Sequence, residues 1–82
     1  MLGPGGIAPL AAAQLAAWQQ IAERWPLTLS AGGRTRLCQS CGKGVYLETD
    51  EHGVPYRYTP AERTAHIVLH LRAHHADLDP DR

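Results

Sequence analysis

The chain has 82 residues, among which 8 basic side chains balance 8 acidic ones. This length allows one domain with a small core, which a bound metal ion or a partner surface commonly reinforces. The balanced charge removes the strong cationic field expected of a protein that binds nucleic acid through many phosphate contacts. The longest apolar stretch, from Ile7 to Ala17, is interrupted by Pro9 and Gln14 and follows no basic region, so it matches neither a secretion signal nor a membrane span. We therefore expect a cytoplasmic protein with reduced thiols.

The first third of the chain is predicted to form one amphipathic helix. Residues 1–7 are rich in glycine and proline without an anchoring element, and we expect them to be disordered. The alanine-rich segment 8–25 predicts a helix, with Pro26 just past its end. Residues 26–36, which contain two adjacent glycines, are predicted to be a connector. The apolar side chains of the helix fall close together on the helical wheel: Leu10, Leu15, Trp18, Ile21 and Trp25.

A β-hairpin and a second helix are predicted next. The segments VYLET and VPYRY are rich in β-branched and aromatic residues and flank DEHG, whose Gly53 can adopt the positive φ of a tight turn. Thr59, Pro60 and Glu62 form a helix start, in which the threonine is the N-cap, the proline takes the first helical position and the glutamate completes a capping box. The helix should run from Pro60 to about Ala76.

The two cysteines, Cys38 and Cys41, are separated by two residues and followed by glycine. Such a pair can form a redox disulfide, supply half of a metal site or serve as small apolar side chains. A redox pair of the thioredoxin type would open a helix, and no helical pattern follows Cys41. On the second predicted helix, His70 and His74 lie one turn apart. Two thiolates facing two imidazoles suit tetrahedral zinc, so we predict a structural Zn²⁺ site formed by Cys38, Cys41, His70 and His74.

The fourth metal ligand has an alternative in His75, because zinc sites of this kind separate their histidines by three to five residues. We favour His74, since a pair of histidines four residues apart shares one face of a helix without unwinding it. His66, one turn earlier on the same helix, is expected to be a solvated or capping side chain and not a spare ligand.

The segments LCQSC and IVLHLRAHH resemble the Cys2His2 zinc finger, which often reads His-Leu-Arg-x-His after an apolar residue three positions earlier. The matching residues are Ile67, His70, Leu71, Arg72 and His74. The resemblance covers Leu37 to about His75 and implies a β-hairpin packed on a helix with zinc between them. One feature differs: 28 residues, from Gly42 to Leu69, separate the second cysteine from the first histidine, where the family has about twelve. The chain is more similar to single fingers of small bacterial and phage proteins than to tandem arrays.

The resemblance also implies positions for reading DNA bases. Counting back from His70 gives Arg63, His66 and Leu69, but the capping box starts the helix before Arg63, so these three residues would lie within the helix and not at its tip. Nearby acidic residues leave only a small positive excess around the candidate nucleic-acid contacts. These contacts are Arg34, Arg36, Arg57, Arg63 and Arg72.

The sequence therefore predicts an α+β fold: a zinc-stabilised ββα finger over residues 37–76, an additional N-terminal α-helix and an acidic tail over residues 77–82. Neither a His-Glu-x-x-His nor a His-x-Glu motif is present, and four protein ligands would close the coordination shell of the metal, so we expect no enzyme. We expect an adaptor or regulator that binds an unidentified protein partner, with DNA or RNA binding as the alternative.

The apolar stripe of the N-terminal helix must be buried, because an isolated helix of this length is marginal in water. It can dock on the apolar side of the finger and give a monomer, or it can pair with a second chain and give a homodimer. We favour docking, since the connector is long enough to fold back. The apolar side of the finger consists of Val45, Leu47, Ile67, Val68 and Leu71.

Overall fold

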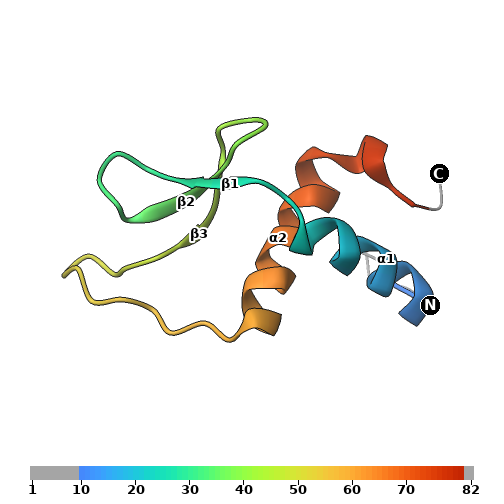
Figure 1. Cartoon of the computed structure of the whole chain (residues 1–82), viewed down its shortest axis with the longest axis horizontal. Helices are drawn as coiled ribbons and strands as arrows, with labels where there is room; N and C mark the ends of the chain where they lie inside the picture. Colours follow the sequence, from blue (N-terminus) through green and yellow to red (C-terminus); the bar gives the residue numbers. More distant parts are fainter. Residues whose placement is uncertain (1–9, 81–82) are drawn as a thin grey trace, which may run out of the picture.

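Residues 10–80 are described by the computed structural model, which shows an α+β arrangement of two helices and an antiparallel sheet of three strands (Figure 1). The elements in chain order are α1 (Ala12–Glu23), β1 (Leu27–Leu29), β2 (Thr35–Cys38), β3 (Gly44–Leu47), α2 (Pro60–His74) and the short 3-10 helix η1 (Ala76–Leu78). The predicted α+β class is confirmed, with a three-stranded sheet in place of the predicted two-stranded hairpin. The segment predicted to be disordered, 1–7, lies outside the described residues, as do the last two residues of the predicted acidic tail.

The sheet has the order β1-β2-β3, and both neighbouring pairs are antiparallel. Leu27 of β1 faces Cys38 of β2, and Thr35 of β2 faces Leu47 of β3. The two cysteines therefore lie at the end of β2 and in the turn between β2 and β3. Helix α2 packs against β3 on one side and against α1 on another, so it joins the two parts of the molecule (Figure 1).

The predicted hairpin pairs the wrong strands: the strand that pairs with VYLET precedes it in the chain instead of following it. Strand β3 covers most of the predicted strand VYLET, but its partner is β2, which begins inside the predicted connector 26–36 together with β1. The segment VPYRY forms no strand and makes one isolated bridge, between Thr49 and Pro55. Proline lacks the backbone N–H that a strand ladder needs, which limits pairing at this point.

The turn predicted around Gly53 is present even though no strand follows it. Gly53 has a φ of 80°, and its N–H donates to the carbonyl of Asp50 over 3.1 Å. The carboxylate of Asp50 accepts from the backbone N–H groups of His52, at 2.8 Å, and Val54, at 2.9 Å. These are the bonds by which aspartate stabilises a turn.

The start of α2 agrees with the predicted capping box. The Thr59 hydroxyl accepts from the Glu62 N–H over 3.1 Å, and the Glu62 carboxylate accepts from the Thr59 N–H over 2.9 Å. The helix ends at His74, two residues before the predicted end at Ala76. No helix within residues 10–80 combines the length and the apolar character that crossing a membrane requires.

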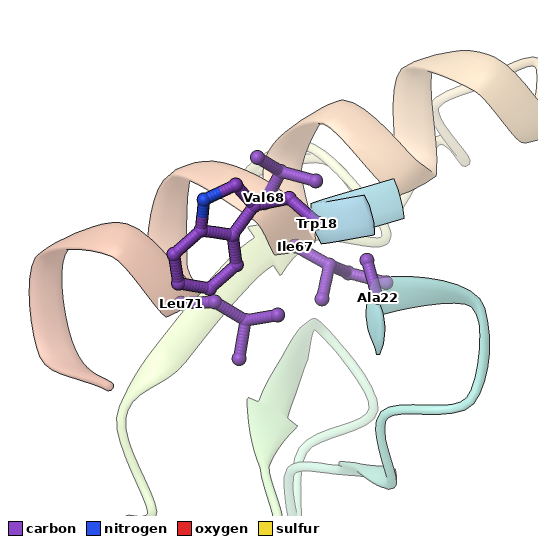
Figure 2. Packing of buried hydrophobic residues seen from close by; sticks show 5 residues of the cluster. All are labelled: Trp18, Ala22, Ile67, Val68 and Leu71. Atoms are coloured by element: carbon purple, nitrogen blue, oxygen red, sulfur yellow. The ribbon is translucent and has the colours of Figure 1, made fainter. Parts of the chain in front are cut away.

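The core lies between the two helices, and its buried side chains are Trp18, Ala22, Ile67, Val68 and Leu71. Figure 2 shows the Trp18 indole from α1 lying against the apolar side chains of α2. Val45 and Tyr46 of β3 pack against the edge of this cluster, whereas Leu47 is 48% exposed and lies outside it. The predicted docking of the N-terminal helix is thus confirmed for Val45, Ile67, Val68 and Leu71, whereas Leu47 was wrongly included in the docking surface.

Candidate metal centre

The two thiols lie at the end of β2 and in the turn that joins it to β3. Cys38 is the last residue of β2 and is fully buried, whereas Cys41 lies in the turn and is exposed. The Cys38 N–H donates to the Lys43 carbonyl over 2.8 Å, and the Gly42 N–H donates to the Cys38 carbonyl over 2.7 Å. Gly42 has a φ of 78°, a conformation that favours glycine. The glycine after the second cysteine is therefore required by the backbone of the turn.

The two imidazoles come from the C-terminal end of α2. His70 lies in the last turns of the helix and is buried, with 7% of its surface exposed. His75 is the C-cap, with φ of −135° and ψ of 42°, so the chain leaves the helical conformation at this residue. With this change of backbone direction, the His75 ring lies beside the cysteines.

The four residues that come together are Cys38, Cys41, His70 and His75, whose ligand atoms all lie within 4.8 Å of one another. Cys38 Sγ is 3.5 Å from His75 Nε2, and Cys41 Sγ is 3.5 Å from His70 Nε2. The favoured fourth ligand, His74, is not part of this group and is exposed, although its ring centroid is 5.0 Å from that of His70. The structure thus brings the alternative histidine into the group, because α2 ends one residue before it.

A fifth side chain contacts this group, and the sequence did not indicate it. The Trp25 indole N–H donates to Cys38 Sγ over 3.2 Å. Burial raises the pKa of the Cys38 thiol, but the hydrogen bonds from Trp25, Cys41 and His70 outweigh it and lower the pKa to about 6. The sequence placed Trp25 on the apolar stripe of the first helix, and no spacing rule links a tryptophan to a cysteine 13 positions away.

Two of the arginines predicted to contact nucleic acid are engaged within the protein. Arg36 Nη2 lies 3.4 Å from a carboxylate oxygen of Glu48, and both side chains are partly buried. Arg34 Nη2 donates to the backbone carbonyl of Asp50 over 3.3 Å. The charge of Arg36 is therefore partly neutralised by Glu48, and the Arg34 guanidinium is held against the backbone at Asp50.

The other three arginines do not gather around one groove. Arg63 lines a cleft of about 350 Å³ together with Arg36. Arg72 lines a different groove, of about 310 Å³, between α1 and α2. Arg57 is exposed in the segment before α2. The five arginines therefore do not form one basic face along any of the described grooves.

Taken together, residues 10–80 form an α+β domain in which a Cys2His2 group bridges the sheet and the C-terminal helix and could hold a metal ion. Comparison of the chain with protein-family models, with curated proteins and with solved structures gives no match. The likeness to a zinc finger accordingly rests on the hairpin, the helix and the four side chains themselves.

Proposed function

We propose that the chain is a small, non-enzymatic zinc-binding module in which the metal is structural. The observation that supports this proposal best is the convergence of two thiols and two imidazoles from separate elements. Thiolate and imidazole together are the ligand set that zinc prefers in closed structural sites. Four protein ligands leave no open position for a substrate, which is the reason for proposing a structural role and no catalysis.

Two sulfur-to-nitrogen distances within the group match those expected around zinc, and all four ligand atoms lie within 4.8 Å of one another. Zinc bonds of about 2.3 Å to sulfur and about 2.0 Å to nitrogen, set at the tetrahedral angle, place the two ligand atoms about 3.5 Å apart. The pairs Cys38 with His75 and Cys41 with His70 each have an Sγ to Nε2 distance of 3.5 Å. A bound zinc ion would cross-link the β2–β3 turn to the end of α2.

The metal assignment is tested by loading the purified protein with Co²⁺, which reports thiolate ligands and tetrahedral geometry through its absorption. We expect one ion per chain, lost in H70A and retained in H52A. His52 lies in the exposed turn before Val54 and is the matched control, because its side chain is 77% exposed. Equal metal content in H70A and wild type, or octahedral cobalt spectra in wild type, would contradict the assignment.

We further propose that the module acts as an adaptor that binds a partner protein through the groove between α1 and α2. The groove is apolar, and two of its leucines are exposed: Leu15 at 39% and Leu69 at 54%. The chain carries no net charge, which suits an apolar partner surface better than a polyanion. The residues around the groove are Leu10, Leu15, Gln19, Ala65, Val68, Leu69 and Arg72.

Binding of nucleic acid is the second candidate function. It is favoured by Tyr56, which is 45% exposed and precedes Arg57, since an exposed aromatic ring beside a cation can stack on bases. Titration of the metal-loaded protein with generic duplex and single-stranded DNA at low salt separates the two functions. Binding that weakens steeply with added salt and is lost in Y56A would favour nucleic acid. Absence of binding at low salt would favour the adaptor.

A further inference from the structure

Trp25 contacts two members of the metal group from outside it. Its indole N–H donates to Cys38 Sγ over 3.2 Å. Its ring also packs against the His75 imidazole, with the two ring centroids 5.0 Å apart and the planes inclined by 58°. One side chain therefore touches a thiol from the end of β2 and an imidazole from the end of α2.

We propose that Trp25 is a positioning residue of the metal centre, which orients the Cys38 thiolate and the His75 ring and couples metal binding to the docking of α1. This inference rests on the proposed function, since it assigns a role within the same metal site. A metal site of two cysteines and two histidines does not require a tryptophan. The proposed role of Trp25 is therefore a specific feature of this chain.

The hydrogen bond to sulfur favours the form of the site that binds metal. The indole N–H can only donate, and a thiolate accepts a hydrogen bond more strongly than a neutral thiol does. The bond from Trp25 therefore stabilises negative charge on Cys38 Sγ and restricts its direction. Partners that hold metal ligands from outside in this way typically change metal affinity by about 10-fold to 100-fold.

The backbone on both sides of Trp25 fixes its position. Its own N–H donates to the carbonyl of Ala22 over 3.1 Å, and Ala22 is a buried core residue of α1. The carbonyl of the next residue, Pro26, accepts over 3.1 Å from the N–H of Gln39, which directly follows Cys38. Trp25 is thus held between the last turn of α1 and the cysteine turn. Because coupling between two sites is reciprocal, an undocked α1 should weaken metal binding, and a bound metal should favour docking.

The test compares Co²⁺ binding by wild type, W25F and W18F. We expect W25F to bind Co²⁺ about 10-fold more weakly and to shift the thiolate-to-cobalt charge-transfer band, because it lacks the N–H donor. W18F is the matched control: Trp18 is the other tryptophan and belongs to the helix core, so W18F should leave the charge-transfer band unchanged even if it lowers stability. The band responds to the electron density on sulfur and would not move if Trp25 only filled space.

A second variant separates the N–H from the ring. Replacement of Trp25 by benzothienylalanine keeps the shape of the indole but puts sulfur in place of the N–H. We expect it to reproduce the shifted band of W25F while retaining the fold. Wild-type affinity and an unshifted band in both variants would overturn the inference and leave the zinc site standing. Failure of wild type to give thiolate-to-cobalt bands would instead overturn the proposed function.

Discussion

His75 shows how one backbone change decides the composition of a site. In an uninterrupted α-helix a residue five positions after His70 would point about 140° away from it around the axis. The helix ends at His74, and His75 adopts φ of −135° and ψ of 42°, so its ring reaches Cys38. Helical periodicity indicated His74 because it assumes that the helix continues. The length of α2, and with it the fourth member of the group, could not be predicted to one residue from the sequence.

Substitution of the two adjacent histidines tests this placement. We expect H75A to weaken Co²⁺ binding by at least 10-fold, because it removes a ligand atom that lies within 4.8 Å of the other three. H74A should bind Co²⁺ almost as wild type does, since His74 is exposed and outside the group. Competition against a chelator of known affinity measures both variants. Loss of binding in H74A with retention in H75A would show that the helix continues by one residue when metal is bound.

The Cys38 thiol makes the stability of the metal-free protein depend on pH. Its pKa of about 6 lies below the ordinary value for cysteine, so the folded chain loses this proton more readily than the unfolded chain. The resulting stabilisation is fully present above the ordinary thiol pKa of about 8.5 and is lost as the pH falls through the folded-state pKa. Metal-free C41S keeps the hydrogen bonds from Trp25 and His70 but loses that of the Cys41 thiol, so we expect its stability to rise as the pH increases toward 8.5, by less than a folded-state pKa of about 6 would give.

The thiolate absorbance near 240 nm of metal-free C41S reports Cys38 alone and provides the measurement. We expect its midpoint well below that of the unfolded chain in denaturant. The variant C38S/C41S, which lacks both thiols, is the control and should lose the rise in stability with pH. A folded-state midpoint equal to the unfolded one would contradict the prediction.

At the scale of the elements, the sequence correctly predicted the features that depend only on residues close together in the chain. Thr59 and Glu62 form both bonds of the capping box, and Gly53 adopts the positive φ that its turn requires. The hairpin was misplaced because strand formation depends on a partner as well as on propensity. Thr35–Cys38 has modest β-propensity but pairs with two neighbours, β1 and β3, whereas VPYRY has high propensity and contains a proline. Pairing of this kind is a tertiary property.

The docking of α1 depends on Trp18, which is 2% exposed in the core between the helices. We expect W18A to lower the free energy of unfolding by about 3 kcal/mol or more, the usual cost of truncating a buried aromatic side chain. Such a loss is a large part of the stability of a small domain. Urea unfolding of the metal-loaded protein measures it.

Gln20 lies on the same helix and is exposed, so Q20A is the matched control and should change stability by less than about 0.5 kcal/mol. If W18A and Q20A were equally stable, α1 would not be docked in solution, and its apolar stripe would be available to a second chain. The oligomeric state of W18A, measured by light scattering, would then distinguish a dimer from an undocked monomer.

On the scale of the whole molecule, α2 packs against β3 and takes part in two further contacts within residues 10–80. One is the apolar core with α1, which the helical periodicity of both segments predicted. The other is the group of cysteines and histidines that joins α2 to the sheet, three of whose members the spacing predicted. Trp25 contacts both, since it packs against the core and donates to Cys38. This connection could not be predicted, because it depends on where the end of α1 meets the cysteine turn.

Removal of metal should therefore affect the whole domain and not the cysteine turn alone. The described core has few fully buried apolar side chains, and a chain of this size is marginally stable without a further constraint. A metal ion present at 100 times its dissociation constant adds about 2.7 kcal/mol to the free energy of unfolding. In a domain of this length, that gain corresponds to a rise in melting temperature of roughly 10 to 20 °C.

We expect a strong chelator to lower the melting temperature by this amount, measured by circular dichroism at 222 nm for the helices and in the near ultraviolet for Trp18 and Trp25. Both signals should be lost together, because Trp25 links the metal group to α1. In C38S/C41S, which cannot hold the ion, the chelator should have no effect. A wild-type protein that melts at the same temperature with and without chelator would show that the four side chains come together without metal stabilising the fold.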